Sequence, residues 1–194
     1  MTIQFSKTAE MPTKYGDFKI ISFKQEGDIH EHCILYKGNL ADKDNVLTRV
    51  HSECLTGDVF SSKKCDCGDQ LEESMRAIAE KGTGIIIYLR QEGRGIGLFN
   101  KINAYALQDN GQDTIQANHS LGFETDLRDF TIAAKVLDYL NIHSIELLSN
   151  NPQKIEVLEN EGINITRRIS LITKANKHNA EYLNVKKEQL KHLL

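Results

Sequence analysis

The chain has 194 residues, of which 40% are hydrophobic and 26% are charged. A chain of this length can bury one sizeable core but is short for two full domains, so we expect one compact domain over residues 1–194. The formal net charge of -3 argues against a general nucleic-acid binder, because such proteins usually carry a basic face. An anionic ligand must therefore be met by a local cluster of basic residues.

The N-terminal residues 1–18 lack the apolar core of a signal peptide, and no window approaches the roughly 18 apolar residues of a membrane helix. We therefore expect a cytoplasmic protein with no membrane partner. In a reducing compartment the four cysteines are not expected to form disulfides, and three of them fall within residues 54–67. Metal binding is the better expectation for these three.

The first fifty residues alternate apolar and polar positions, with glycines between the alternating segments. This alternation predicts short strands at residues 17–23, 32–38 and 45–52. Cys33 lies in the second of them and is expected to be a small core residue.

Beyond residue 68 the pattern becomes helical, and Gly82 is expected to terminate a helix over residues 69–81. Strands then alternate with helices along the chain. We predict strands at 85–90, 144–150 and 163–170, and helices at 98–110, 129–140, from Pro152 onward and from residue 179. The order predicts an α/β fold with a mixed sheet, strand-rich in its N-terminal third and alternating in the remainder.

Three cysteines, Cys54, Cys65 and Cys67, have ten residues between the first two and one between the last two. Thiolates are strong zinc ligands, and a ten-residue loop can return the chain to the same ion. In a closed structural site, the candidates for the fourth ligand are Cys33, His51 and Asp66. In an open catalytic site, water takes the fourth position. The charged residues that crowd Cys54 favour the open site.

A glycine-rich loop at residues 91–97 joins the predicted strand 85–90 to the following helix. Its glycines allow backbone N–H groups to approach a ligand closely, and Arg94 supplies a positive charge. The spacing matches neither the dinucleotide fingerprint nor the Walker A loop, so the loop alone indicates an anionic ligand or a plain tight turn. Arg49, Arg128 and Lys154 also fall near element ends, where they could bind a polyphosphate.

Five segments together resemble the GTP cyclohydrolase II family over almost the whole chain. They are RVHSECLTGDVFSSKKCDCGDQL (49–71), RQEGRGIGL (90–98), KINAYALQD (101–109), ANHSLGF with DLRDF (117–130) and SNNPQK (149–154). The resemblance implies an enzyme of riboflavin biosynthesis that hydrolyses GTP to a diaminopyrimidine ribosyl monophosphate, formate and pyrophosphate. It also implies that the protein is a homodimer and binds GTP. Each subunit would hold one Zn²⁺, and Mg²⁺ would bind the substrate phosphates.

The resemblance assigns roles to individual residues. It makes Cys54, Cys65 and Cys67 the zinc ligands, with water in the fourth place. The implied substrate-binding residues are Arg49, Val50, His51, Ser52, Glu53, Gln70, Glu92, Gly93, Arg94, Thr114, Ser149 and Lys154. The implied catalytic residues are Asp126 as proton acceptor, Arg128 as nucleophile at the α-phosphorus and Tyr105 beside the reacting ring.

The nucleophilic role meets a physical objection, because neutralising a guanidinium at pH 7 costs about 7 kcal/mol. Stabilisation of transition-state charge by Arg128 is therefore an open alternative. Three positions depart from the family pattern: Leu89 replaces a frequent histidine, Ser149 a frequent threonine, and Leu127 an acidic residue. Ser149 keeps its hydroxyl, so its contact should survive, whereas Leu89 and Leu127 remove polar groups, which could alter the rate or its pH dependence.

Other functions remain to be weighed. A zinc-dependent nucleotide deaminase would show HxE followed by PCxxC, and no PCxxC follows HSEC here. A structural zinc module that binds nucleic acid or protein fits poorly with the net negative charge. A GTP-using relative that stops at another product would be distinguished only by product analysis.

Overall fold

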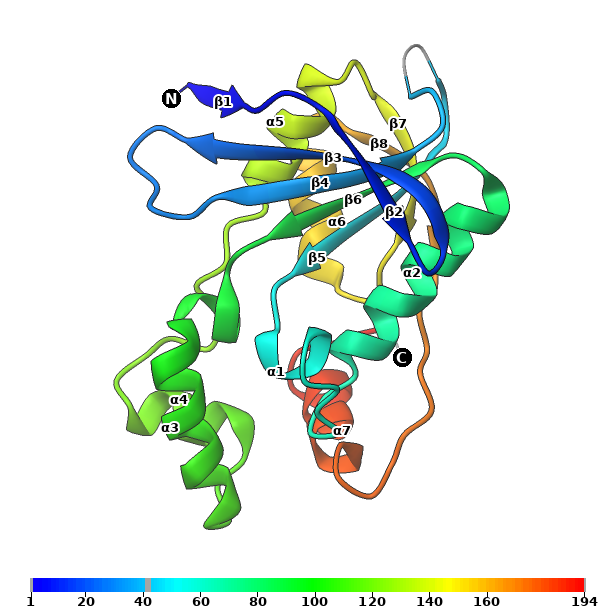
Figure 1. Ribbon diagram of the computed structural model, residues 1–194. Coiled ribbons are helices and arrows are strands. Elements are labelled where there is room, and N and C mark those ends of the chain that lie inside the picture. Colours follow the sequence, from blue (N-terminus) through cyan, green and yellow to red (C-terminus); the bar gives the residue numbers. More distant parts are fainter. Residues whose placement is uncertain (1, 41–42, 194) are drawn as a thin grey trace.

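The computed structural model describes residues 2–40 and 43–193, which form one α/β domain (Figure 1). The N-terminal elements are β1 (Ile3–Phe5), β2 (Ala9–Thr13), β3 (Gly16–Gln25), β4 (His32–Lys37), β5 (Val46–Ser52), α1 (Leu55–Asp58), α2 (Cys67–Lys81) and β6 (Gly84–Leu89). They are followed by the 3-10 turn η1 (Glu92–Gly95), α3 (Gly97–Asp109), α4 (Thr114–Ser120), α5 (Thr131–Tyr139), β7 (Ser144–Leu148), α6 (Pro152–Asn160), β8 (Asn164–Ile169) and α7 (Ala180–Glu188).

The described strands form one mixed sheet of eight, in the order β1-β3-β4-β6-β5-β7-β8, with β2 paired to β3. The pairs made by β1 to β4 are antiparallel, including β4 with β6. The pairs β5–β6, β5–β7 and β7–β8 are parallel. Helices occupy the crossovers that parallel strands require, which confirms the predicted mixed α/β fold.

Both faces of the sheet are covered, and this explains why its central strands are apolar on both sides. Along β6, Ile85 and Ile87 belong to a core shared with residues of α5 and α6. Ile86, which points the other way, packs in a second core with Ile78 of α2. Central strands buried this fully hold the residues that follow them in defined positions.

The functional residues gather at the carboxyl edge of the parallel strands. Residues 52–54 leave β5 there, residues 90–94 leave β6, and residues 149–151 leave β7. In Figure 1, α1, α3, α4 and α7 lie beyond this edge, below the sheet. The carboxyl ends of strands are where open α/β sheets usually bind their ligands.

Most predicted elements lie within a few residues of their positions in the structure, but five elements were missed. They are β1, β2, α1, η1 and α4, all of which are shorter than eight residues. In addition, α2 begins at Cys67, two residues before the predicted start, so that this cysteine stands in the first helical turn. No helix in residues 2–40 or 43–193 is both long and apolar enough to span a membrane.

Candidate active site

A pocket opens at the carboxyl edge of the sheet, between the sheet and the helices beyond it. Its empty volume, open mouth included, is about 1090 Å³. Sixteen sequence-predicted residues line it: Arg49, His51, Ser52, Glu53, Cys54, Cys65, Cys67, Gln70, Glu92, Gly93, Arg94, Tyr105, Thr114, Arg128, Ser149 and Lys154. The fold thus brings together residues more than one hundred positions apart.

Three thiols meet on one wall of this pocket. The sulfur atoms of Cys54, Cys65 and Cys67 all lie within 4.8 Å of one another. Cys54 precedes α1 as its N-cap and Cys67 opens α2, so the starts of two helices position the first and last cysteines of the cluster. Three buried or half-buried sulfurs at this separation suit a thiophilic divalent cation such as zinc.

Two glycines allow the thiols to come this close. A Cβ atom on Gly57 would lie 3.0 Å from the Cys65 sulfur and 3.2 Å from the Cys54 sulfur. A Cβ on Gly68 would lie 2.4 Å from the carbonyl oxygen of Gly57. Neither position has room for a side chain, so the packing of α1 on α2 depends on both glycines.

None of the candidates for a fourth protein ligand joins the thiols within the described part of the chain. The Nε2 atom of His51 lies 3.1 Å from a carboxylate oxygen of Asp58. Asp66 is paired with Lys186 at 2.5 Å, and Cys33 lies in β4. A site with three thiol donors leaves one tetrahedral position for a molecule other than the protein.

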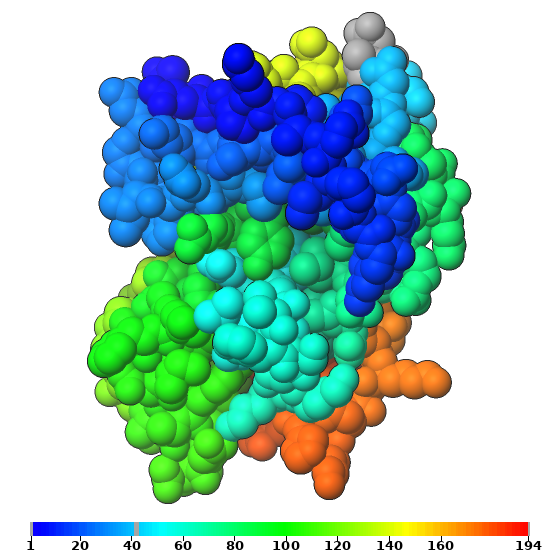
Figure 2. Space-filling model, in the orientation of Figure 1, coloured from blue at the N-terminus to red at the C-terminus, as the bar shows by residue number. Residues whose placement is uncertain are grey.

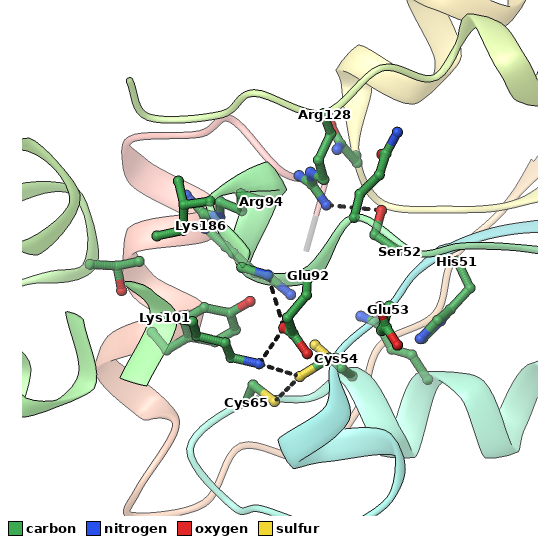
Figure 3. A pocket seen from close by; sticks show the side chains of 18 of the residues that line it. His51, Ser52, Glu53, Cys54, Cys65, Glu92, Arg94, Lys101, Arg128 and Lys186 are labelled. Atoms are coloured by element: carbon green, nitrogen blue, oxygen red, sulfur yellow. Dashed lines mark hydrogen bonds and ion pairs between the residues drawn. The ribbon is translucent and has the colours of Figure 1, made fainter. Parts of the chain in front are cut away.

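Lys101 connects the thiol cluster to Glu92 (Figure 3). Its Nζ atom donates to Cys54 Sγ at 3.1 Å and to Glu92 Oε1 at 2.7 Å. Hydrogen bonds from Cys65 and Cys67 lower the pKa of the Cys54 thiol far below its usual range, and Lys101 lowers it further. The Cys54 thiolate is therefore the charged form that the site favours.

Glu92 has a structural task besides its place in the pocket lining. Its second carboxylate oxygen accepts from the backbone N–H of Leu55 at 2.6 Å, and its first accepts from Gly93 N at 2.8 Å. Both oxygens are thus engaged by the protein. The residue ties the loop after β6 to the start of α1.

Asp58, which the sequence left without a role, holds two residues of the pocket lining in place, His51 and Cys54. It accepts hydrogen bonds from Tyr88 Oη at 2.8 Å and from the Cys54 backbone N–H at 3.0 Å, in addition to its contact with His51. Burial lowers the pKa of His51, so the ring is neutral and donates from Nε2 to Asp58. Its Nδ1 atom is buried without a partner in the described residues and remains available as an acceptor.

A line of buried polar side chains crosses the pocket from β5 to α7. Arg49 donates to the Leu148 carbonyl at 2.9 Å and to Gln70 Oε1 at 2.7 Å. Gln70 in turn donates to Asp66 at 2.7 Å, and Asp66 also accepts from Lys186. Burial lowers the pKa of Arg49 to about 10, which still leaves it charged at neutral pH.

The glycine-rich loop presents Arg94 through an unusual backbone. Gly93, Arg94 and Gly95 all have positive φ angles of 62°, 60° and 92°. Non-glycine residues rarely adopt this conformation, so the surrounding structure must hold Arg94 in it. One terminal nitrogen of Arg94 is buried with no hydrogen-bond partner among the described residues. This is an arrangement in which a ligand anion would supply the missing partner.

Arg128 and Asp126 form a bidentate pair beside the pocket. Arg128 donates to the two carboxylate oxygens of Asp126 at 2.8 and 2.5 Å, and to Ser52 Oγ at 3.3 Å. Burial alone would lower the pKa of Arg128, but the hydrogen bonds and charge of Asp126 outweigh burial and raise it. Asp126 itself does not line the pocket and acts on it through Arg128.

Lys154 reaches the pocket from α6 and is fully enclosed by protein. It donates to the Val50 carbonyl at 2.7 Å and lies 5.0 Å from the centre of the Phe130 ring. Burial, followed by the neighbouring Arg49 and Arg128, lowers its pKa well below the usual value. The side chain of Val50 points into the core instead, so only its backbone contributes here.

Three further predicted residues line the pocket from α3, α4 and the segment after β7. Tyr105 on α3 has its hydroxyl 3.4 Å from that of Thr56, and burial raises its pKa to about 12. Thr114 opens α4, whose N-terminus is closed by a capping box from Asp113. The Ser149 hydroxyl accepts from the backbone N–H of Asn151 at 3.1 Å.

Two departures from the family pattern lie away from the pocket lining. Leu89 is fully buried in the core that the sheet shares with α5 and α6, whereas the side chain of Leu127 is about half exposed. Sequence reasoning also missed several residues that line the pocket. They are Lys64, Gln91, Ile96, Lys101, Ala104, Gln108, Asn118, Asn150, Asn151, Tyr182, Lys186 and His192. Of these, only Lys101 had a usable signal, since it stands one helical turn before Tyr105.

A thiol cluster beside a basic pocket, at the carboxyl ends of parallel strands, defines a class of protein that binds an anionic ligand next to a metal site. The family described as GTP cyclohydrolase II matches residues 4–170. A protein named GTP cyclohydrolase-2 from Blochmanniella floridana is 54% identical over 185 residues, 95% of this chain and 93% of its own. Proteins of that name from Shigella boydii serotype 18 and Buchnera aphidicola are each 51% identical and cover 96% and 99% of this chain, and 95% and 99% of their own. The chain therefore belongs to the GTP cyclohydrolase II family and is an enzyme.

Proposed function

We propose that this protein hydrolyses GTP to 2,5-diamino-6-hydroxy-4-(5-phosphoribosylamino)pyrimidine, formate and pyrophosphate, the first step of riboflavin biosynthesis. The observation that carries the proposal is the thiol cluster on the wall of a pocket lined by seven buried or half-buried lysine and arginine side chains. Family membership supports the substrate. The pocket supports the chemistry, because it sets a metal-competent site beside charges suited to phosphates.

We propose zinc as the metal, held by Cys54, Cys65 and Cys67, one ion per chain. When bound, it would supply the activated water that opens the guanine ring at neutral pH. The buried cation of Lys101 suits this assignment, because three thiolates and one Zn²⁺ carry a net negative charge. Mg²⁺ is proposed to enter on the nucleotide phosphates, since the thiols are the only metal-type cluster in the described residues.

Tyr105 is proposed to donate a proton or a hydrogen bond to the reacting ring. Its hydroxyl remains protonated at neutral pH, because burial raises its pKa to about 12. The hydroxyl lies near Thr56, whose own oxygen is 3.6 Å from the Cys54 sulfur. Tyr105 therefore stands beside the thiols, where ring opening would take place.

The cleavage that releases pyrophosphate needs charge neutralisation, which we assign to Arg94, Arg128 and Lys154. We propose that Arg128 stabilises transition-state charge and does not attack phosphorus. Its bidentate pair with Asp126 favours the protonated guanidinium, which has no lone pair to offer. A guanylyl adduct on Arg128, trapped by rapid quenching and found by mass spectrometry, would refute this assignment.

The function is tested by product analysis. Purified zinc-loaded protein is incubated with GTP and Mg²⁺, and formate, pyrophosphate and the pyrimidine are quantified together, with Cys54→Ser as control. We expect equal yields of all three, and no formate from the control. Pyrophosphate and GMP without formate would instead identify a relative that stops at another product. No turnover of any kind would favour a structural zinc module.

We also propose a cytoplasmic homodimer. Reduced thiols of the kind seen here persist in the cytoplasm. The dimer is supported by α3, which exposes Leu98, Phe99 and Ile102 on adjoining positions of one face. Light scattering should give twice the mass of one 22.0 kDa chain, and Phe99→Glu should reduce it to one. A wild-type protein that elutes as a single chain would contradict the dimer.

A further inference from the structure

The C-terminal segment, residues 171–193, lies outside the part of the chain that matches the family yet reaches the pocket. Tyr182 and Lys186 on α7, and His192 beyond it, contribute to the lining. In Figure 1, α7 lies below α1, at the end of the molecule away from the sheet. Figure 2 shows the orange part of this segment packed beside the cyan residues that lead from β5 through the thiols.

Specific contacts hold the segment in place. The Lys186 ammonium pairs with Asp66 at 2.5 Å, and both side chains are at most one-tenth exposed. The backbone N–H of Leu193 donates to the Asn150 carbonyl at 2.8 Å. Asp66 separates two of the thiols along the chain, so α7 is anchored beside the proposed metal site.

Lys186 joins a group of cations whose charges exceed those of the acids paired with them. Arg128 lies above Arg94 and Lys186 in Figure 3, and it forms an ion pair with Asp126. Among the described residues, Lys154 donates a hydrogen bond only to a backbone carbonyl, and one terminal nitrogen of Arg94 has no hydrogen-bond partner. The pKa of His192 is lowered to about 3 by burial and then by the surrounding Lys186, Arg128, Arg94 and Lys154. Four basic side chains therefore gather where α7 meets the pocket.

The ammonium of Lys186 can donate a hydrogen bond to a further acceptor. It has three N–H donors, and in the described residues one carboxylate accepts from it. It also lies 4.7 Å from the centre of the Tyr182 ring, so the aromatic face limits where the ammonium can point. The next residue, Lys187, is exposed and has no place in the pocket lining.

We propose that Lys186 is a substrate-binding residue, carried by the C-terminal helix, that contacts the phosphate chain of the nucleotide together with Arg94, Arg128 and Lys154. This proposal rests on the proposed function, because it takes a nucleoside triphosphate as the ligand. A lysine on a terminal helix can meet phosphates as a flexible point charge, whereas the arginines supply planar contacts. On this account α7 is part of the substrate pocket and not a surface appendage.

The test isolates the lysine from its partner by comparing Asp66→Asn with the double variant Asp66→Asn/Lys186→Met. Both variants lack the Asp66 carboxylate, so removing Lys186 in the double variant does not leave a buried negative charge without its partner. Inorganic triphosphate and guanosine are the probes, measured by calorimetry on zinc-loaded protein at equal zinc content. Lys187→Met is the control, because it removes one positive charge from α7 at a position outside the pocket lining.

We expect the double variant to bind triphosphate about tenfold or more weakly than Asp66→Asn, with guanosine binding unchanged. Lys187→Met should bind both probes as the wild type does. Equal triphosphate binding by Asp66→Asn and the double variant would overturn the proposal, as would a parallel loss of guanosine binding, which would mean that Lys186 only fastens the helix. Failure of the proposed function shows separately, as wild-type protein that releases no formate from GTP.

Discussion

The ammonium of Lys101 lies 3.1 Å from the sulfur of Cys54. Burial alone would lower the pKa of Lys101, but the Cys54 thiolate and Glu92 raise it well above its usual value. A buried lysine that stays charged beside a thiolate offsets the negative charge of a three-thiolate site. The relationship makes Lys101 a supporting residue of the metal site, and it can be tested apart from catalysis.

Replacing Lys101 with methionine should weaken zinc binding. The substitution keeps most of the side-chain volume but leaves the thiolates and Glu92 without their cation. Loss of such an outer partner typically reduces metal affinity about 10–100-fold. Competition with a chromophoric chelator measures the change, and Lys101→Arg, which keeps the charge, should lose less. Wild-type affinity in Lys101→Met would show that the contact does not support the metal.

Gly57→Ala should disturb the thiols while leaving the sheet intact. The new methyl group would press on the sulfurs of Cys65 and Cys54, at 3.0 and 3.2 Å. Overpacking of this kind costs roughly 1–3 kcal/mol, here concentrated on the metal ligands. We expect weaker zinc binding with an unchanged far-ultraviolet circular dichroism spectrum. Zinc affinity equal to that of the wild type would mean that the loop relaxes without moving the sulfurs.

Asp58→Asn should lower activity by releasing His51 and the turn that carries Cys54. Asp58 accepts from His51, Tyr88 and the Cys54 backbone, and an amide has only one oxygen with which to accept. A buried donor left without its acceptor costs about 1–3 kcal/mol, so the melting temperature should also fall. Thermal melting and turnover are both measured, with Asp69→Asn, on the first turn of α2, as the control. An unchanged melting temperature and an unchanged turnover rate would show that Asp58 does not support His51 and the turn that carries Cys54.

Docking of the C-terminal segment should weaken in acid because of His192. Its pKa is about 3 in the docked state, whereas an undocked histidine titrates near its ordinary value of 6.5. The undocked state therefore binds more protons between these values, so docking is fully stable above about pH 6.5 and weakens as the pH falls towards 3. Hydrogen exchange of residues 180–188, corrected for intrinsic rates, should show less protection at pH 5 than at pH 7. His192→Gln should abolish the difference, and equal wild-type protection at both pH values would contradict the assignment.

The central fold was predictable because its signals are local. Strand alternation and helix terminators such as Gly82 need only neighbouring residues, and β3 to β8 follow the predicted segments closely. The missed elements α1 and η1 are too short to show a period. Their shape depends on tertiary contacts instead, as with Glu92, which holds the start of α1 from a different loop.

The site was predictable only in part. The spacing of the cysteines indicated a metal site, and the resemblance to the family supplied most of the pocket lining. Apart from Lys101, the partners that support these residues carried no signal, because their contacts span long stretches of chain. Asp66 and Lys186 are 120 positions apart, and nothing in the charged C-terminal sequence distinguishes Lys186 from Lys187.

The most direct test of the account is a titration of zinc into metal-free protein, with formate release from GTP as the readout. If the thiol cluster is the catalytic metal site, formate release should rise linearly and level off at one zinc per chain, and Cys54→Ser should release none at any zinc concentration. Formate release by metal-free protein, or by zinc-saturated Cys54→Ser at the wild-type rate, would contradict the assignment of ring opening to this cluster.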